Sequence, residues 1–99
     1  MEEKGFQIFA RNYFTRMSEI DIVAYHPKED FFCFVEVKFR KNASSGNPLE
    51  AVTFSKQKKI RMAARVYLME QKINIEKACI RFDVIGILGD TITHVENAF

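Results

Sequence analysis

The sequence has no tryptophan and contains only two prolines, two cysteines and four glycines in 99 residues. No apolar run approaches the ~20 residues of a membrane-spanning helix, so we expect no association with a membrane through such a helix. The opening residues, MEEKG, do not have the features of a secretory signal. A cytoplasmic location is therefore the expectation. Internal repeats and low-complexity tracts are also missing, which argues against repeat and disordered architectures.

The two cysteines, Cys33 and Cys79, lack the spacing of a metal site or a redox motif. Neither belongs to a CxxC pair or has a histidine nearby, and each falls in a segment that resembles a strand. We expect both to be free thiols buried in the core. His26 and His94 also lack ligand spacing, and we expect both at the surface.

Length and composition indicate one folded domain that spans residues 1–99. Hydrophobic residues make up 47% of the chain, including ten phenylalanines, and charged residues make up 28%. That apolar content is sufficient for a core, and the composition is far from that of disordered proteins.

Positive charge is concentrated in one segment, although the whole chain carries only +2. Residues 38–65 sum to +7, whereas residues 1–37 sum to −3 and residues 66–99 to −2. Such a segment favours a polyanion as partner, and a solvated lysine-rich helix face is the alternative. The candidate nucleic-acid-binding residues in it are Arg40, Lys41, Lys56, Lys58, Lys59, Arg61 and Arg65.

Hydrophobic periodicity predicts the element order βββαββ. The expected strands cover residues 5–14, 19–25, 31–39, 79–88 and 91–95, and a Gly89-Asp90 turn joins the last two. A helix is expected from a cap at Thr53 or Ser55 to about Lys72, after a helical turn that Pro48 opens. Its apolar stripe is Ile60, Ala63, Ala64, Tyr67 and Leu68.

Two charged triplets, Glu19-Ile20-Asp21 and Glu36-Val37-Lys38, interrupt the predicted strands. Residues two apart in a strand share a face, so Glu36 and Lys38 share one and Glu19 and Asp21 share another, with Ile20, Ile22 and Ala24 opposite. If the strands are neighbours, the acidic groups meet on one patch, which a divalent cation stabilises. A salt bridge between Glu36 and Lys38 is the structural alternative.

Several blocks resemble the YraN-like family of predicted endonucleases, in order and spacing, over nearly the whole chain. The matching blocks are residues 10–13, 19–24, 34–40, 48–52, 81–85 and 96–99. The resemblance implies an α/β fold with a restriction-endonuclease-like PD-(D/E)xK core, related to archaeal Holliday junction resolvases. In that core a central mixed β-sheet is flanked by helix.

The same resemblance implies a nuclease that hydrolyses phosphodiester bonds in DNA, either branched or single-stranded, with Mg²⁺ or Mn²⁺. Asp21 and Glu36 match the metal-binding acidic residues, and Lys38 matches the lysine that positions the attacking water. The Val37 carbonyl and Glu19 are further candidate metal ligands. The basic helix would contact phosphates without reading sequence.

The chain departs from the family pattern at its start. Members of the YraN-like family usually begin with a helix before the segment equivalent to Gly5. Without this first helix, the chain would lack a glutamate that often completes the metal site in related nucleases. Its absence would also uncover one face of the sheet, which favours a homodimer, an exchanged segment or a partner. The alternative function is therefore a catalytically weak or inactive module that binds nucleic acid or protein.

Overall fold

A computed structural model describes residues 2–40 and 52–99, with Arg40 described by its backbone alone. The elements in chain order are η1 (Glu2–Lys4), β1 (Gln7–Phe14), β2 (Glu19–His26), β3 (Phe31–Arg40), α1 (Phe54–Glu70), β4 (Ile80–Leu88) and β5 (Thr91–Val95). This order confirms the predicted βββαββ arrangement. The helical turn expected from Pro48 lies outside the described residues.

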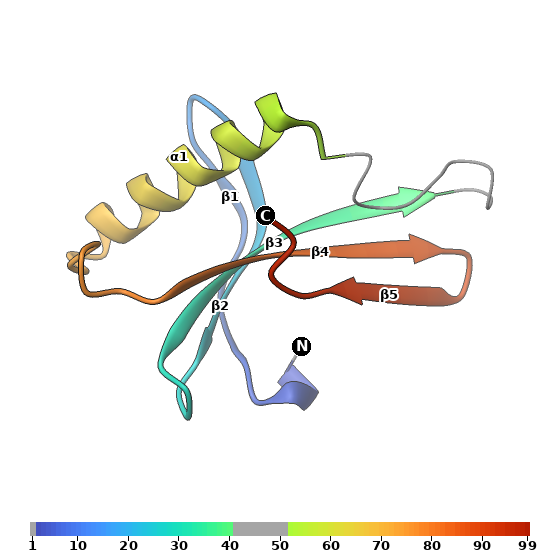
Figure 1. Ribbon diagram of the computed structural model, residues 1–99, viewed down its shortest axis with the longest axis horizontal. Helices are drawn as coiled ribbons and strands as arrows, with labels where there is room; N and C mark the ends of the chain where they lie inside the picture. The colour runs from blue at the N-terminus through green and yellow to red at the C-terminus, as the bar shows by residue number, and fades with distance from the viewer. Residues whose placement is uncertain (1, 41–51) are drawn as a thin grey trace.

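The five strands form one mixed sheet in the order β1-β2-β3-β4-β5, so the predicted mixed sheet is confirmed. Every neighbouring pair is antiparallel except β3 and β4, which run parallel. A parallel pair needs a long crossover connection, and α1 lies in that connection. Figure 1 shows the helix across one side of a strongly twisted sheet, with η1 on the other side.

β3 is the middle strand and has buried apolar residues on both faces. Phe34 belongs to the larger core cluster, which includes the buried residues of α1. Cys33 and Val35 belong to a second cluster with Phe6 and Ala24 on the opposite face. This double burial explains why the strand sequence, FFCFVEVKFR, is apolar at nearly every position.

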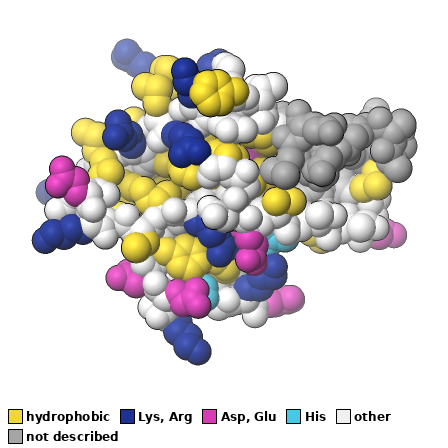
Figure 2. Space-filling view, in the orientation of Figure 1, with side chains coloured by type: hydrophobic (Ala, Val, Ile, Leu, Met, Phe, Trp, Pro, Cys, Tyr) yellow, Lys and Arg dark blue, Asp and Glu magenta, His cyan; other side chains and the backbone are white. Residues whose placement is uncertain are grey.

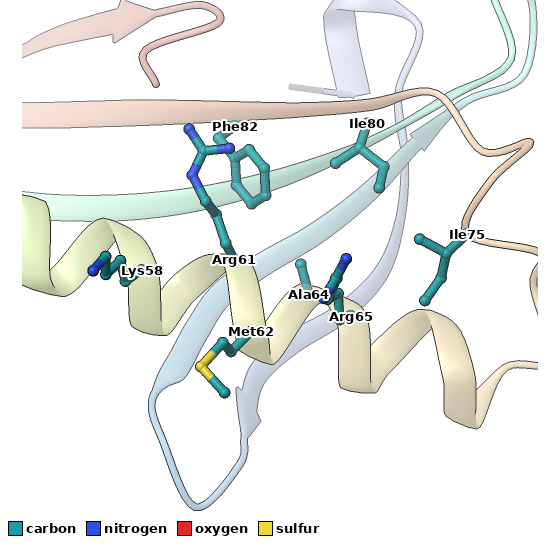
Figure 3. A pocket seen from close by; sticks show the side chains of 8 residues that line it. All are labelled: Lys58, Arg61, Met62, Ala64, Arg65, Ile75, Ile80 and Phe82. Atoms are coloured by element: carbon teal, nitrogen blue, oxygen red, sulfur yellow. The ribbon is translucent and has the colours of Figure 1, made fainter.

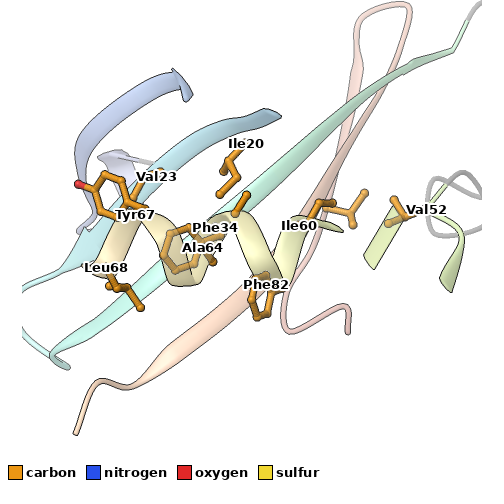
Figure 4. Packing of buried hydrophobic residues seen from close by; sticks show 11 residues of the cluster. Ile20, Val23, Phe34, Val52, Ile60, Ala64, Tyr67, Leu68 and Phe82 are labelled. Atoms are coloured by element: carbon orange, nitrogen blue, oxygen red, sulfur yellow. The ribbon is translucent and has the colours of Figure 1, made fainter. Parts of the chain in front are cut away.

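The apolar stripe of α1 packs on the sheet as predicted. Its buried residues are Ile60, Ala63, Ala64, Tyr67 and Leu68. They contact Ile20 and Val23 of β2, Phe34 of β3 and Phe82 of β4, as Figure 4 shows. Across the two described ranges, the structure contains no helix long and apolar enough to span a membrane.

The prediction that residues alternate strictly between faces along β2 was wrong. Ile20 and Val23 both lie in the cluster below α1, whereas Ile22 and Ala24 pack in the other cluster. In the neighbouring strand β1, Asn12 has a φ of 53°, and the β1–β2 register shifts between Ile8 and Ala10. The chain neighbours of Asn12, Arg11 and Tyr13, pair with Ile22 and Ile20. The left-handed residue interrupts the pleat at the level of Asp21.

One of the two cysteines is placed as expected. Cys33 is buried and free, whereas Cys79 is exposed and lies one residue before β4 begins. The carbonyl of Cys79 accepts a hydrogen bond from the Phe32 N–H at 2.8 Å. The backbone of Cys79 is therefore held beside β3 while its side chain lies at the surface.

The start of α1 offers a test of local stability. Thr53 Oγ1 accepts a hydrogen bond from the Lys56 N–H at 3.2 Å and occupies the N-cap position. We expect Thr53→Ala to lower the free energy of unfolding by about 1 kcal/mol. Chemical denaturation followed by circular dichroism measures this change. The control is Ser55→Ala inside the first turn, and an equal loss in both variants would contradict the capping role.

Candidate functional site

Glu36 of β3 is a buried carboxylate beside two lysine ammonium groups. Its side chain is 6% exposed, and Oε1 lies 3.0 Å from Lys38 Nζ and 3.8 Å from Lys56 Nζ. Lys38 follows on the same face of β3, as the spacing predicted, and Lys56 comes from the first turns of α1. A buried carboxylate without such partners would cost several kcal/mol. The salt bridge considered as the structural alternative is therefore present in this structure.

The side chain of Asp21 in β2 contacts the backbone of the Glu36-Val37-Lys38 triplet. Asp21 Oδ2 accepts a hydrogen bond from the Val37 N–H at 2.7 Å. The ladder between β2 and β3 ends at the pair Ile22 and Val35, so Val37 has no backbone acceptor from β2. Because a backbone N–H in a sheet needs an acceptor, the side chain of Asp21 replaces the missing carbonyl. Asp21 thus lies where the two strands separate, next to Glu36 in β3.

The structure does not bring all the acidic groups to one face. Asp21 lines a hollow of about 290 Å³ together with Arg11, Asn12, Ile22, Val37 and Phe39. Ile22 and Val37 belong to the core cluster on the face away from α1, whereas Glu36 reaches Lys56 of α1. This placement differs from the common face that was expected for the acidic groups. Asp21 and Glu36 therefore approach the gap between β2 and β3 from different sides.

The two further candidate metal ligands are Glu19 and the Val37 carbonyl. Glu19 begins β2 and has Phe14 of β1 as its cross-strand partner. Val37 pairs with Ile85 of β4 and contacts Asp21 through its N–H rather than its carbonyl. Within residues 2–40 and 52–99, no group of three or more His, Cys, Asp or Glu side chains lies close enough to hold a metal ion.

The basic residues of α1 divide between two places. Lys56 approaches Glu36, whereas Lys58, Arg61 and Arg65 line a larger hollow beside β4. Figure 2 shows lysine and arginine side chains gathered over the helix with apolar surface among them. Lys59 is exposed on the same helix and does not line that hollow. Arg40 ends β3, and Lys41 lies outside the described residues.

A second acid, Asp83 of β4, is completely buried in a network that sequence reasoning did not predict. Arg81 donates to it from Nε and Nη2, both at 2.8 Å, and the Asn97 N–H donates at 3.0 Å. His94 Nε2 lies 2.6 Å from Asp83 Oδ2. The signal available in the sequence was the Arg81-x-Asp83 spacing, which places both side chains on one face of a strand.

The surface position expected for the histidines was wrong for His94. The side chain of His94 is only 11% exposed because it packs on Asp83. His26 is partly buried and stacks on Phe31 with ring centroids 5.2 Å apart. Neither contact involves Asp21 or Glu36, so both histidines serve the packing of the sheet.

The contacts of Asp83 determine its charge. Burial by itself raises the pKa of this carboxyl, but the hydrogen bonds from Arg81, the Asn97 N–H and His94 lower its pKa below the ordinary value of 3.8. Burial and the neighbouring carboxylate of Asp83 raise the pKa of the Cys33 thiol. Asp83 is therefore ionised at neutral pH, while Cys33 stays a neutral thiol.

Residues 1–87 match the model of the uncharacterised protein family UPF0102. The chain belongs to the UPF0102 family. A UPF0102 protein of Lachnoclostridium phytofermentans is 43% identical over 99 residues, which cover 100% of this chain and 81% of that protein. Another from Chlorobium phaeobacteroides is 46% identical over 107 aligned residues, with 98% of this chain and 82% of that protein covered. Family membership is consistent with the YraN-like resemblance.

In this UPF0102 member, Asp83 provides a test of stability against pH. We expect Asp83→Asn to lower the free energy of unfolding at pH 7 by about 3 kcal/mol, because Arg81 loses its anionic partner. The folded-state pKa of Asp83 is lowered, so its stabilisation is present above pH 3.8 and is lost as pH falls through the folded-state pKa. Urea unfolding at a series of pH values from neutral to acid measures the free energy of unfolding of both proteins.

Asp90→Asn, in the exposed turn between β4 and β5, is the control for this experiment. It removes the same charge without breaking a buried network, and we expect a change below about 0.5 kcal/mol. The difference between Asp83→Asn and the unaltered protein should shrink in acid. A difference that stays constant down to pH 2 would show that the ionised carboxylate is not the stabilising group.

Proposed function

We propose that this protein is a divalent-metal-dependent nuclease that hydrolyses phosphodiester bonds in DNA on a restriction-endonuclease-like fold. The observation that carries the proposal is the position of Glu36 and Lys38 on the middle strand, with Asp21 bound to the intervening Val37. Buried charges at the centre of a sheet are costly, and a site that uses them explains their presence. The mixed sheet and its parallel β3–β4 crossover are compatible with that fold.

The donor atoms at this site suit Mg²⁺ or Mn²⁺. Asp21 and Glu36 offer carboxylate oxygens, the ligand type that these hard cations prefer. Mg²⁺ is commonly held by one or two carboxylates and completes its coordination with waters and substrate phosphates. Two carboxylates that border the gap between β2 and β3 are therefore a sufficient protein contribution. The Val37 carbonyl and Glu19 remain candidate additional ligands.

Each side chain has a defined task in the proposed reaction. A bound Mg²⁺ or Mn²⁺ would stabilise charge on the phosphate and help to form the hydroxide nucleophile. Lys38 Nζ, 3.0 Å from Glu36, is positioned to hold the attacking water as a hydrogen-bond donor. Lys56 supplies a second positive charge at the same carboxylate. Its ammonium group can also donate a hydrogen bond to a DNA phosphate.

The basic residues of α1 are proposed to hold the DNA backbone. Lys56, Lys58, Lys59, Arg61 and Arg65 project from this one helix. We assign Arg40 and Lys41 the same role from their place in the positive segment. Contacts with phosphates position a substrate without reading its sequence, so we propose that DNA structure rather than sequence decides what is bound.

A catalytically weak or inactive DNA-binding module is the second candidate. The observation that favours it is the satisfied ion pair, since Lys38 and Lys56 already neutralise Glu36. In addition, the described part of the chain gathers no third acidic, histidine or cysteine side chain at one point. Under this proposal the basic helix still binds DNA, while the pair Glu36 and Lys38 only stabilises the sheet.

The expected homodimer also remains a prediction. Phe14 is 71% exposed, Phe39 73% and Ile92 68%. These large apolar side chains, together with the edge strand β1, are features by which a second copy can associate.

Cleavage assays on branched, single-stranded and duplex DNA with Mg²⁺ or Mn²⁺ test the proposed activity. We expect Asp21→Asn, Glu36→Gln and Lys38→Met each to reduce the rate at least about 100-fold, because each removes charge stabilisation from the transition state. Asp90→Asn is the control, and its rate should stay within about twofold of the unaltered protein. Cleavage that survives Asp21→Asn and Lys38→Met would reject the mechanism and leave the binding module.

Metal binding can be measured separately by titrating Mn²⁺ in a calorimeter without DNA. We expect Asp21→Asn and Glu36→Gln each to weaken the affinity at least about tenfold, since each removes a charged oxygen ligand. Lys38→Met should preserve or tighten binding, because its ammonium competes with the cation for Glu36. Glu19→Gln decides whether Glu19 is a ligand. Equal Mn²⁺ affinity in all variants would place any cation elsewhere.

A further inference from the structure

A hollow of about 500 Å³ lies between α1 and β4, apart from Asp21 and Glu36. Its apolar walls come from Ala64 and Met62 of α1, from Ile75 after the helix and from Ile80 and Phe82 of β4. Figure 3 shows Ile80 and Phe82 on the sheet side, Ile75 on the segment after the helix and Arg61 reaching toward Phe82, whereas Met62 points to the other side of the helix. This volume falls in the range of roughly 300–1,000 Å³ that small-molecule sites occupy.

The charged side chains that line this hollow are all positive. Lys58, Arg61 and Arg65 line it, and no acidic residue within residues 2–40 and 52–99 does. The Arg61 guanidinium lies 5.2 Å from the ring centroid of Phe82 and 5.5 Å from that of Phe99. The two rings are stacked with centroids 5.1 Å apart. Arg61 is thus held over an aromatic surface, in the arrangement by which arginine also stacks on flat rings.

We infer that this hollow receives an unstacked base of single-stranded DNA, with the flanking phosphates on Lys58, Arg61 and Arg65. The inference rests on the proposed function and deepens it, because it names the form of DNA that is bound. A polyanion explains the uniform positive charge, and a flat, largely apolar group explains the walls of Ile75, Ile80 and Met62. Among polyanions, a single nucleic-acid strand combines both features, and the proposed function selects DNA.

A duplex does not offer the same combination. Its bases are stacked inside the helix, and bringing one into a pocket costs a few kcal/mol of lost stacking and pairing. A single strand exposes its bases already, and the Arg61 guanidinium provides a plane on which a base can stack. We therefore expect the hollow to select single strands over duplexes.

The hollow also borders the helix that carries one of the charged partners of Glu36. Lys56 contacts Glu36, and Lys58, Arg61 and Arg65 follow it along α1. Arg65 follows Lys56 by nine residues, which is about 14 Å along the helix axis. A few nucleotides of an extended strand span this length, and because Lys56 and Arg65 project from opposite sides of the helix, a strand that contacts both must pass around it.

Binding in EDTA tests the inference without cleavage. The probes are a fluorescent oligo-dT, an abasic strand of the same length and a duplex, each measured by fluorescence anisotropy. We expect oligo-dT to bind at least about fivefold more tightly than the abasic strand, because only the former can fill the hollow with a base. Equal affinity for the two strands, or tighter binding of the duplex, would overturn the inference.

Two matched pairs of variants locate the effect. Ile75→Ala and Met62→Ala shorten residues that line the hollow, whereas Ile73→Ala and Met69→Ala make the same changes outside it. We expect the first variant of each pair to reduce the preference for oligo-dT at least about twofold without changing abasic binding. Met62 and Met69 are 49% and 66% exposed, so that pair tests the site without disturbing the core.

The result of the binding experiment can be distinguished from the result of the cleavage assays that test the proposed nuclease. A preference for bases that Met62→Ala reduces and Met69→Ala preserves supports the hollow, even if no cleavage occurs with Mg²⁺ or Mn²⁺. Cleavage that depends on Asp21 and Lys38, together with equal binding of oligo-dT and the abasic strand, supports the nuclease and rejects the hollow as a base site. Equal loss of preference in Met62→Ala and Met69→Ala also rejects it.

Discussion

The burial of Glu36 in the middle strand is the constraint on which this structure depends. A carboxylate that is 6% exposed needs positive partners, and Lys38 of the same strand and Lys56 of α1 provide them. The parallel pairing of β3 with β4 requires a crossover, and α1 in that crossover places its basic first turn at Glu36. The same topology therefore forms the core and brings positive charge to the buried acid.

Two buried acids are held in different ways, and the difference separates stability from function. Asp83 has its oxygens bound by the Arg81 guanidinium, His94 and the Asn97 N–H, so its environment is complete. Glu36 is bound by the ends of two long lysine side chains, both partly exposed. A flexible ammonium exchanges for a metal ion or a phosphate contact more readily than a bidentate arginine does. Asp83 is suited to hold the sheet together, and Glu36 is suited to the proposed chemistry.

The basic helix has a distinct role at each part of its length. Lys56 lies at the buried acid, and Lys58, Arg61 and Arg65 surround an apolar hollow against β4. A helix that only kept the protein in solution would not need its arginines over aromatic rings, as Arg61 lies over Phe82 and Phe99. The proposed reading joins these features in a single path for a DNA strand, with a base site next to a site of hydrolysis.

Local patterns in the sequence determined the element order, the buried stripe of α1, a cap at Thr53 or Ser55 and the shared face of Glu36 and Lys38, because each depends on residues a few positions apart. Tertiary structure alone decided that Ile20 and Val23 share a face, that Asp21 binds Val37, that His94 packs on Asp83 and that Cys79 is exposed. These contacts depend on neighbouring strands. The left-handed Asn12 interrupts the pleat of β1, and the end of the β2–β3 ladder leaves an N–H for Asp21. The hydrophobic periodicity of one strand does not determine its register with the neighbouring strand.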